Sequence, residues 1–252
     1  MVSRISVAFF LVLLGSPLVA QPGDSQAIAL VTQSVAAMGG TAPPDSVANG
    51  TVNTTTGGQT DSGTVRILTR GVDQSSLEYM TGSLNQREVY SQGSGSDVTV
   101  NGVTPQSLEF SSTSQACEFP LPLLLGAQQN PDTVFQYVGL ETVNGVAAQH
   151  VRFWNSYASI AALQPLAEFG VRDLWLDATT NLPVKFAFQR RAADGSVPAV
   201  AIEVVLSNYQ NVNGILYPFS IEKVVSGNLW AIITIQSVTF NNGLTDADFP
   251  IS

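Results

Sequence analysis

Two side chains in this sequence could support nucleophilic or acid–base chemistry, and each is the only one of its kind. His150 is the single histidine and Cys117 the single cysteine. A Ser-His-Asp or Cys-His site would have to use His150, because the imidazole accepts the proton of the nucleophile. His150 falls in a predicted strand, however, and Cys117 in a Leu/Pro-rich segment. We therefore expect a hydrogen-bonded strand histidine and a buried, apolar cysteine without a disulfide partner.

Metal and phosphate chemistry have equally little support. One histidine and one cysteine cannot build a multi-histidine zinc site. The sequence has no HExxH pair, no phosphate-cradling G-x-x-x-x-G-K-[ST] loop and no EF-hand loop. Asp246 and Asp248 are expected to form a solvated cap, and residues 93–96 a loop. Catalytic carboxylates from distant strands would be invisible here, so an enzyme stays open, but we predict binding without catalysis and without a cofactor.

The composition limits the class of protein further. Of 252 residues, 44% are apolar and only 12% are charged, about half the usual share of charge. The net charge is −9. A phosphate backbone would repel such a chain, so we expect no nucleic-acid partner. The low charge content also argues against a coiled coil.

The N-terminus resembles an export signal. Arg4 precedes an apolar run at residues 5–14, and Ala20 follows a helix-breaking Gly-Ser-Pro sequence. This arrangement predicts a signal peptide at residues 1–20. The apolar run is shorter than the roughly 20 residues that a spanning helix needs, and no cysteine follows Ala20 for lipid attachment. We expect a soluble periplasmic protein with one domain at residues 21–252 and no transmembrane segment.

Hydrophobic periodicity predicts one helix followed by many strands. Apolar side chains recur at helical spacing over residues 25–38, and Gly39-Gly40 would end the helix. From residue 46 onward, short alternating segments are separated by turns rich in glycine and asparagine. Residues 101–102, Asn-Gly, give a strong hairpin signal. These features predict an antiparallel meander.

Two segments interrupt the strands. Residues 111–130 contain a Leu-rich stretch in which Pro122 could open a short helix. Residues 157–168 form a second possible helix, broken or kinked at Pro165. Strands resume between and after these segments, so we expect a second meander and no internal domain boundary.

The late strands carry apolar residues on both faces. Phe186 and Phe188 share one face of their strand, and the strand that begins at Trp230 is apolar on both sides. Because a sheet with one wet face alternates cleanly, we expect both faces to be covered. A wide, curved sheet encloses more space than strand side chains fill easily. Residues 121–125 could plug that space, a hydrophobic ligand could share it, or the core could be solid.

Short motifs in a fixed order resemble one family. Residues 63–70 resemble its second strand and residues 175–183 its D-x-x-T-x-x-P turn. Residues 209–218 resemble its Y-x-x-V-x-G-x-x-x-P junction, and residues 238–249 its closing segment. Together with the helix, the two meanders and the interruption between them, they make residues 25–250 similar to the LolA-like superfamily. This superfamily contains periplasmic lipoprotein carriers and outer-membrane lipoprotein-sorting proteins.

The resemblance implies a mostly β (α+β) fold. The expected form is an unclosed antiparallel β barrel of about ten strands, with an N-terminal helix and short lid or plug helices. Members of the family hold acyl chains of lipids or lipoproteins in an apolar cavity, or act as envelope sensors. The carrier's Arg-Pro pair, which helps set its lid, is represented by Arg70 followed by Gly71. The proline is absent here. The resemblance therefore supports acyl-ligand binding by this chain more strongly than it supports lipoprotein shuttling.

We therefore predict a carrier-like periplasmic protein that binds a lipid, an acylated protein or another long apolar ligand. The alternative is an envelope sensor or protein-interaction module with a self-filled barrel and an envelope protein as partner. The residues predicted to form the apolar cavity and its lid are Leu121, Leu123, Leu124, Leu125, Arg70, Phe186, Phe188 and Trp230.

Overall fold

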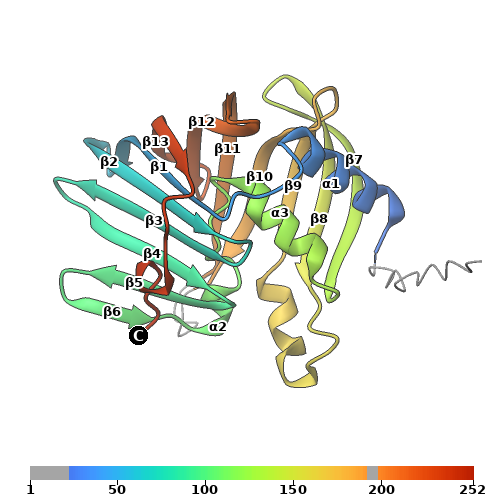
Figure 1. The fold of residues 1–252 in the computed structure, drawn as a ribbon, viewed down its shortest axis with the longest axis horizontal. Coiled ribbons are helices and arrows are strands. Elements are labelled where there is room, and N and C mark those ends of the chain that lie inside the picture. Colours follow the sequence, from blue (N-terminus) through green and yellow to red (C-terminus); the bar gives the residue numbers. More distant parts are fainter. Residues whose placement is uncertain (1–22, 192–197) are drawn as a thin grey trace, which may run out of the picture.

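A single large sheet dominates the computed structural model, which describes residues 23–191 and 198–252 (Figure 1). The predicted signal peptide at residues 1–20 lies outside the described residues. Thirteen antiparallel strands pair in the order β6-β5-β4-β3-β2-β1-β13-β12-β11-β10-β9-β8-β7. The sheet does not close, since β6 and β7 form its two edges. The predicted mostly β, unclosed architecture is therefore confirmed, with thirteen strands in place of about ten.

The strands form two meanders that are joined by the pairing of β1 with β13. The first consists of β1 (Asp45–Thr56), β2 (Gln59–Arg70), β3 (Gln74–Thr81), β4 (Asn85–Ser91), β5 (Ser94–Thr99) and β6 (Gly102–Pro105). The second consists of β7 (Thr133–Val143), β8 (Val146–Asn155), β9 (Arg172–Asp177), β10 (Pro183–Arg190), β11 (Val200–Val212), β12 (Ile215–Val225) and β13 (Asn228–Phe240). The helices are α1 (Ser25–Ala37), α2 (Leu108–Ser111), α3 (Pro120–Gln129) and the 3₁₀ helices η1 (Ala161–Phe169) and η2 (Asp246–Asp248).

A tight turn at residues 92–93 makes β5 begin earlier than the sequence indicated. Gln92 and Gly93 both have positive φ, 51° and 88°, which matches the twist of a two-residue hairpin. Strand β5 therefore restarts at Ser94, and the prediction of a loop over residues 93–96 is wrong. The next hairpin forms as predicted but one residue earlier, since Thr99 pairs with Gly102.

Helix α1 confirms the predicted N-terminal helix. The Asp24 side chain accepts a hydrogen bond from the backbone N–H of Gln26 at 2.8 Å, which caps the first turn. The helix stops at Met38, and Gly39 follows with φ 122°. A Cβ on Gly39 would lie 2.8 Å from the carbonyl oxygen of Gly214, so only glycine fits this close approach to the sheet.

One face of the sheet carries the main hydrophobic core, and we call it the inner face. Helices α1 and α3 pack against it, together with inward side chains such as Ile67, Leu174 and Phe186. The opposite, outer face is partly open to solvent: Leu229 of β13 is 45% exposed and Ile232 of the same strand 38%. The expectation that both faces of this strand are covered is therefore wrong, because neither helix reaches its outer side.

The C-terminal segment crosses the outer face of the first meander. Phe249 packs with Val47, Leu68 and Val89 in a second, smaller core. Asp45, at the start of β1, accepts hydrogen bonds from the backbone N–H groups of residues 242–244 at 2.6–3.0 Å. Burial alone would raise the pKa of Asp45, but these hydrogen bonds outweigh it and lower the pKa. The segment is thus fastened to the outer face by apolar contacts and by one carboxylate.

Candidate ligand-binding site

Helix α3 lies between the two meanders and enters the core with its first half (Figure 1). The five residues from Pro120 to Leu124 are all buried, whereas Leu125 is half-buried and Gln129 exposed. A helix that is apolar on all sides must be surrounded by other apolar groups. The predicted helix is present, although it begins two residues before Pro122. It fills the interior as a plug and does not lie over it as a surface lid.

An aromatic stack and a buried ion pair hold the chain just before this helix. The Phe119 ring stacks on Tyr217 of β12, with centroids 4.5 Å apart. The Glu118 carboxylate lies 2.9 Å from Nζ of Lys223, also on β12, and both side chains are nearly inaccessible. Burial alone would lower the pKa of Lys223, but the charge of Glu118 and the smaller effects of Tyr79 and Glu88 together outweigh burial and raise the pKa. The start of α3 is therefore tied to the centre of the sheet.

The structure brings most of the predicted site residues into one cluster. Leu121, Leu123 and Leu124 pack in the same core as Phe186 and Phe188. Leu125 and Trp230 border that core, and Trp230 meets the Tyr79 ring edge-on at 5.3 Å. Their role in ligand binding remains a prediction.

Arg70 is the predicted site residue that lies elsewhere. It shares the outer face with Leu68, and its side chain is 37% exposed. Its Nη1 donates to Oδ1 of Asp246 at 2.7 Å and to Oε1 of Gln74 at 2.6 Å. The bond to Asp246 helps to hold the C-terminal segment on the outer face. The hydrogen bonds of Arg70 therefore go to Gln74 and Asp246, and not to α3.

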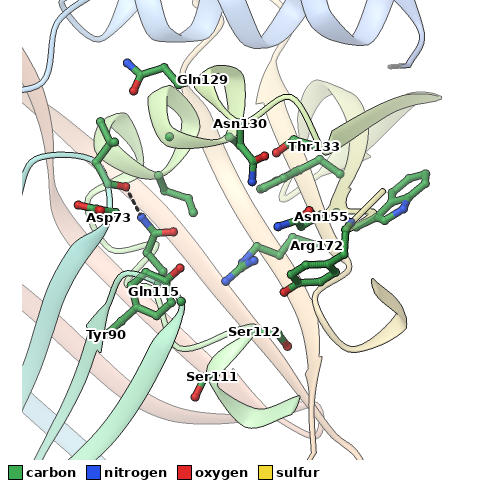
Figure 2. A pocket seen from close by; sticks show the side chains of 18 residues that line it. Asp73, Tyr90, Ser111, Ser112, Gln115, Gln129, Asn130, Thr133, Asn155 and Arg172 are labelled. Atoms are coloured by element: carbon green, nitrogen blue, oxygen red, sulfur yellow. Dashed lines mark hydrogen bonds between the residues drawn. The ribbon is translucent and has the colours of Figure 1, made fainter. Parts of the chain in front are cut away.

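A polar cavity of about 350 Å³ opens beside α3, between the two meanders. Its walls combine Val72 and Asp73, which precede β3, and Tyr90 of β4 with residues of β7, β8 and β9. Figure 2 shows Arg172 and Asn155 on one wall, facing Tyr90 and Gln115 on the other. Leu123 and Phe153 also line the cavity, so it borders the apolar core. Sequence reasoning missed this site.

One wall residue has an unusual backbone conformation. Tyr157 has φ 51°, in the left-handed region that non-glycine residues rarely adopt. Its N–H donates to Oδ1 of Asn155 at 3.0 Å, which helps to hold the turn. Strained residues of this kind concentrate at functional sites, which makes the cavity a candidate site on geometric grounds.

His150 and Cys117 occupy structural positions. Nδ1 of His150 lies 2.8 Å from Glu141 and Nε2 lies 2.7 Å from Asp173, so both ring nitrogens are engaged. The Trp175 ring stacks on the imidazole at 4.2 Å. Cys117 is buried, and burial raises the pKa of its thiol to about 12. The predicted hydrogen-bonded histidine and buried cysteine are therefore confirmed.

Over residues 23–191 and 198–252, no three His, Cys, Asp or Glu side chains are grouped so as to hold a metal ion. Over the same residues, no helix combines the length and the apolar character needed to cross a bilayer.

Solved structures of similar fold are known, although no similar sequence was found among curated proteins. No protein-family model matches the chain, and no curated protein matches its sequence. An outer membrane lipoprotein-sorting protein domain from Vibrio parahaemolyticus is similar in structure, with 12% identity and a TM-score of 0.60 over 89% of this chain and 96% of that one. A LolA superfamily protein from Nitrosomonas europaea has 13% identity and a TM-score of 0.56 over 89% and 97%.

A third solved structure is also similar. A DUF1329 family protein from Desulfovibrio piger has 13% identity and a TM-score of 0.58, over 92% of this chain and 98% of that one. At such identities the likeness concerns the fold. It confirms what the sequence resemblance implied: the chain has the LolA-like fold, an unclosed β barrel around an inserted helix.

Proposed function

We propose that this protein binds a long apolar ligand on the inner face of its sheet, and that α3 withdraws to admit it. The ligand is the acyl chain of a lipid or of an acylated protein. The protein acts as an exported, periplasmic carrier without catalytic activity. The observation that carries the proposal is the plug: the fold has an unclosed barrel whose interior is filled by one short inserted helix.

Helix α3 has little stability of its own. It has ten residues and no side-chain cap, and prolines stand at positions 120 and 122. Isolated helices of this length are marginal in water, so packing must hold α3 in place. A hydrocarbon chain offers the same apolar contacts as Leu121 and Leu124 and can replace them without exposing apolar surface.

A buried polar group beside the plug supports the same proposal. The Tyr217 hydroxyl has no hydrogen-bond partner among the described residues, and Phe119 stacks on its ring. Leaving a buried hydroxyl unpaired costs about 1–3 kcal/mol. This cost lowers the stability of the closed form, in which α3 fills the interior. A ligand or water that reaches the Tyr217 hydroxyl would remove the cost.

A second function is favoured by the filled interior itself. If α3 never leaves, the protein is an interaction or sensor module whose barrel is packed by its own side chains. Its partner would then bind the outside of the molecule. The two functions differ in one respect: only the first predicts competition between α3 and an acyl ligand.

The test compares Leu124→Ala with wild type, using a fluorescent fatty alcohol as an uncharged probe. Removing a buried leucine side chain costs about 2–5 kcal/mol of packing. If opening precedes binding, weaker packing raises the open population, and the probe affinity should rise about tenfold or more. Leu140→Ala is the control, because Leu140 of β7 is 60% exposed, and it should leave the affinity unchanged.

Native mass spectrometry of the protein purified from its own envelope supplies the second measurement. A bound lipid mass supports the carrier. A lower melting temperature in Leu124→Ala, with no probe bound by either protein, would identify α3 as ordinary core and favour the module.

A further inference from the structure

Two buried cations on the inner side of the sheet are paired with carboxylates, whereas a third has no such partner among the described residues. Arg190 donates to Glu88 at 2.8 Å, and Lys223 pairs with Glu118 at 2.9 Å. Arg172 is as deeply buried, with 8% of its surface exposed. No carboxylate pairs with it among residues 23–191 and 198–252.

Among the described residues, the Arg172 guanidinium has almost no hydrogen-bond partner. Arg172 stands on β9 in phase with Leu174 and Leu176, which are fully buried, so it points to the inner side. Its Nη1 reaches the carbonyl oxygen of Gly170 only at 3.5 Å, and its buried Nε has no hydrogen-bond partner among the described residues. Buried arginines are rare unless they are paired, because removing an unpaired charge from water is costly.

The guanidinium faces the polar cavity, as Figure 2 shows, with Tyr90 and Gln115 on the opposite wall. Asn155 and Ser112 add further polar groups to the wall. Among the described residues that line the cavity, Asp73 is the one carboxylate; it is solvent-exposed at the edge, where water and salt screen it. The C-terminal turn of α3 also borders the cavity, but its partial dipole is weaker than the full charge of an arginine.

We propose that Arg172 binds an oxyanion, a carboxylate or a phosphate group, inside this cavity. A guanidinium presents a fixed fork of N–H donors that matches both groups. Leu123 and Phe153 line the same cavity and belong to the apolar core. An amphiphile could therefore place its charged end at Arg172 and its chain along α3. This last step rests on the proposed acyl-binding function, whereas a free phosphate would need only the cavity.

The test titrates the protein without its predicted signal peptide, residues 21–252, at pH 8. Three probes are used: a fatty acid, the fatty alcohol of the same chain length, and inorganic phosphate. The variants are Arg172→Gln, which removes the charge, and Arg172→Lys, which keeps it. Arg152→Gln is the matched control, because Arg152 stands on the neighbouring strand and pairs with Asp173 at 2.9 Å.

Wild type should bind the fatty acid about 10- to 100-fold more tightly than the alcohol, as expected for hydrogen bonds to a charged group. Arg172→Gln should abolish this preference and leave the alcohol affinity unchanged. Arg172→Lys should retain part of the preference and Arg152→Gln all of it. In the absence of probe, Arg172→Gln should melt at a higher temperature, because an unpaired buried charge is gone.

The probes separate the two possible sources of the anion. A fatty-acid preference that depends on Arg172 identifies a head-group site. If neither acyl probe binds, the proposed carrier function fails, and stabilisation of wild type but not Arg172→Gln by phosphate still supports the oxyanion site. If Arg172→Gln changes neither the fatty-acid preference nor the response to phosphate, the proposal is overturned. A fall in its melting temperature would then mark the arginine as structural.

Discussion

The buried ion pair between Glu118 and Lys223 should be one of the most sensitive points in the fold. Glu118→Gln removes the charge that compensates Lys223, and Nζ of Lys223 lies only 2.9 Å from the carboxylate. Neither side chain has ready access to water, since their exposed fractions are 3% and 11%. Breaking such a pair from one side costs about 3–5 kcal/mol, a large part of the 5–15 kcal/mol that stabilises a typical domain.

A second variant separates two quantities: the destabilisation caused by an unpaired Lys223 and the net contribution of the ion pair to stability. Glu118→Gln combined with Lys223→Met removes both charges and should recover most of the lost stability, since apolar replacements of buried pairs are often neutral. Glu203→Gln serves as the control, because Glu203 pairs with Lys185 at 3.5 Å and is 42% exposed. It should cost no more than about 1 kcal/mol.

The assay is urea unfolding at pH 7, followed by tryptophan fluorescence. Urea is uncharged and leaves ion pairs unscreened. The reasoning would be refuted if Glu118→Gln lost no more stability than Glu203→Gln. It would also be refuted if the double variant were less stable than Glu118→Gln, because the pair would then contribute more than the compensation of one charge.

Two further predictions concern groups whose pKa the fold shifts. The lowered pKa of Asp45 means that its carboxylate stabilises the fold above the unfolded value of about 3.9, and this contribution is lost as the pH falls through the lower folded pKa. The difference in urea midpoint between wild type and Asp45→Asn should therefore be full at pH 6 and shrink below about pH 4; an unchanged gap down to pH 3 would contradict this. Cys117, whose pKa burial raises to about 12, should resist iodoacetamide at pH 8 until urea unfolds the protein, and Cys117→Ala should cost only about 1–2 kcal/mol. Fast labelling of the folded protein would show that the thiol is accessible.

Local patterns predicted the elements of this fold well. Helical spacing located α1, and the prolines around the Leu-rich segment located α3, because both signals lie within a few neighbouring residues. Several hairpins followed from Gly and Asn turns, but the early start of β5 at Ser94 did not. Burial of Leu121 and Leu124 also followed, since an apolar segment between two meanders has to pack against the sheet.

The site could not be predicted as completely, because its walls come from segments far apart in the chain. Arg172 nevertheless left a signal: it alternates in phase with Leu174 and Leu176, which marks an arginine that points into the core. The direction of Arg70 was harder to infer, because Ile67 and Leu68 are neighbours on opposite faces and both are buried. When adjacent residues are both apolar, periodicity cannot say which face is inside.

The pairing of β1 with β13 has a consequence for how the protein is made. Ser46 pairs with Phe240, so the centre of the sheet joins the two ends of the described chain. Each meander can form from local hairpins, but the seam between them has to wait for the last strand to emerge, and such distant contacts form slowly. A chain cut short before β13 would leave β1 and β12 as two long unpaired edges, which favour aggregation. The sheet therefore cannot be completed until β13 has been synthesised. A prematurely terminated product should be insoluble or degraded, and not partly active.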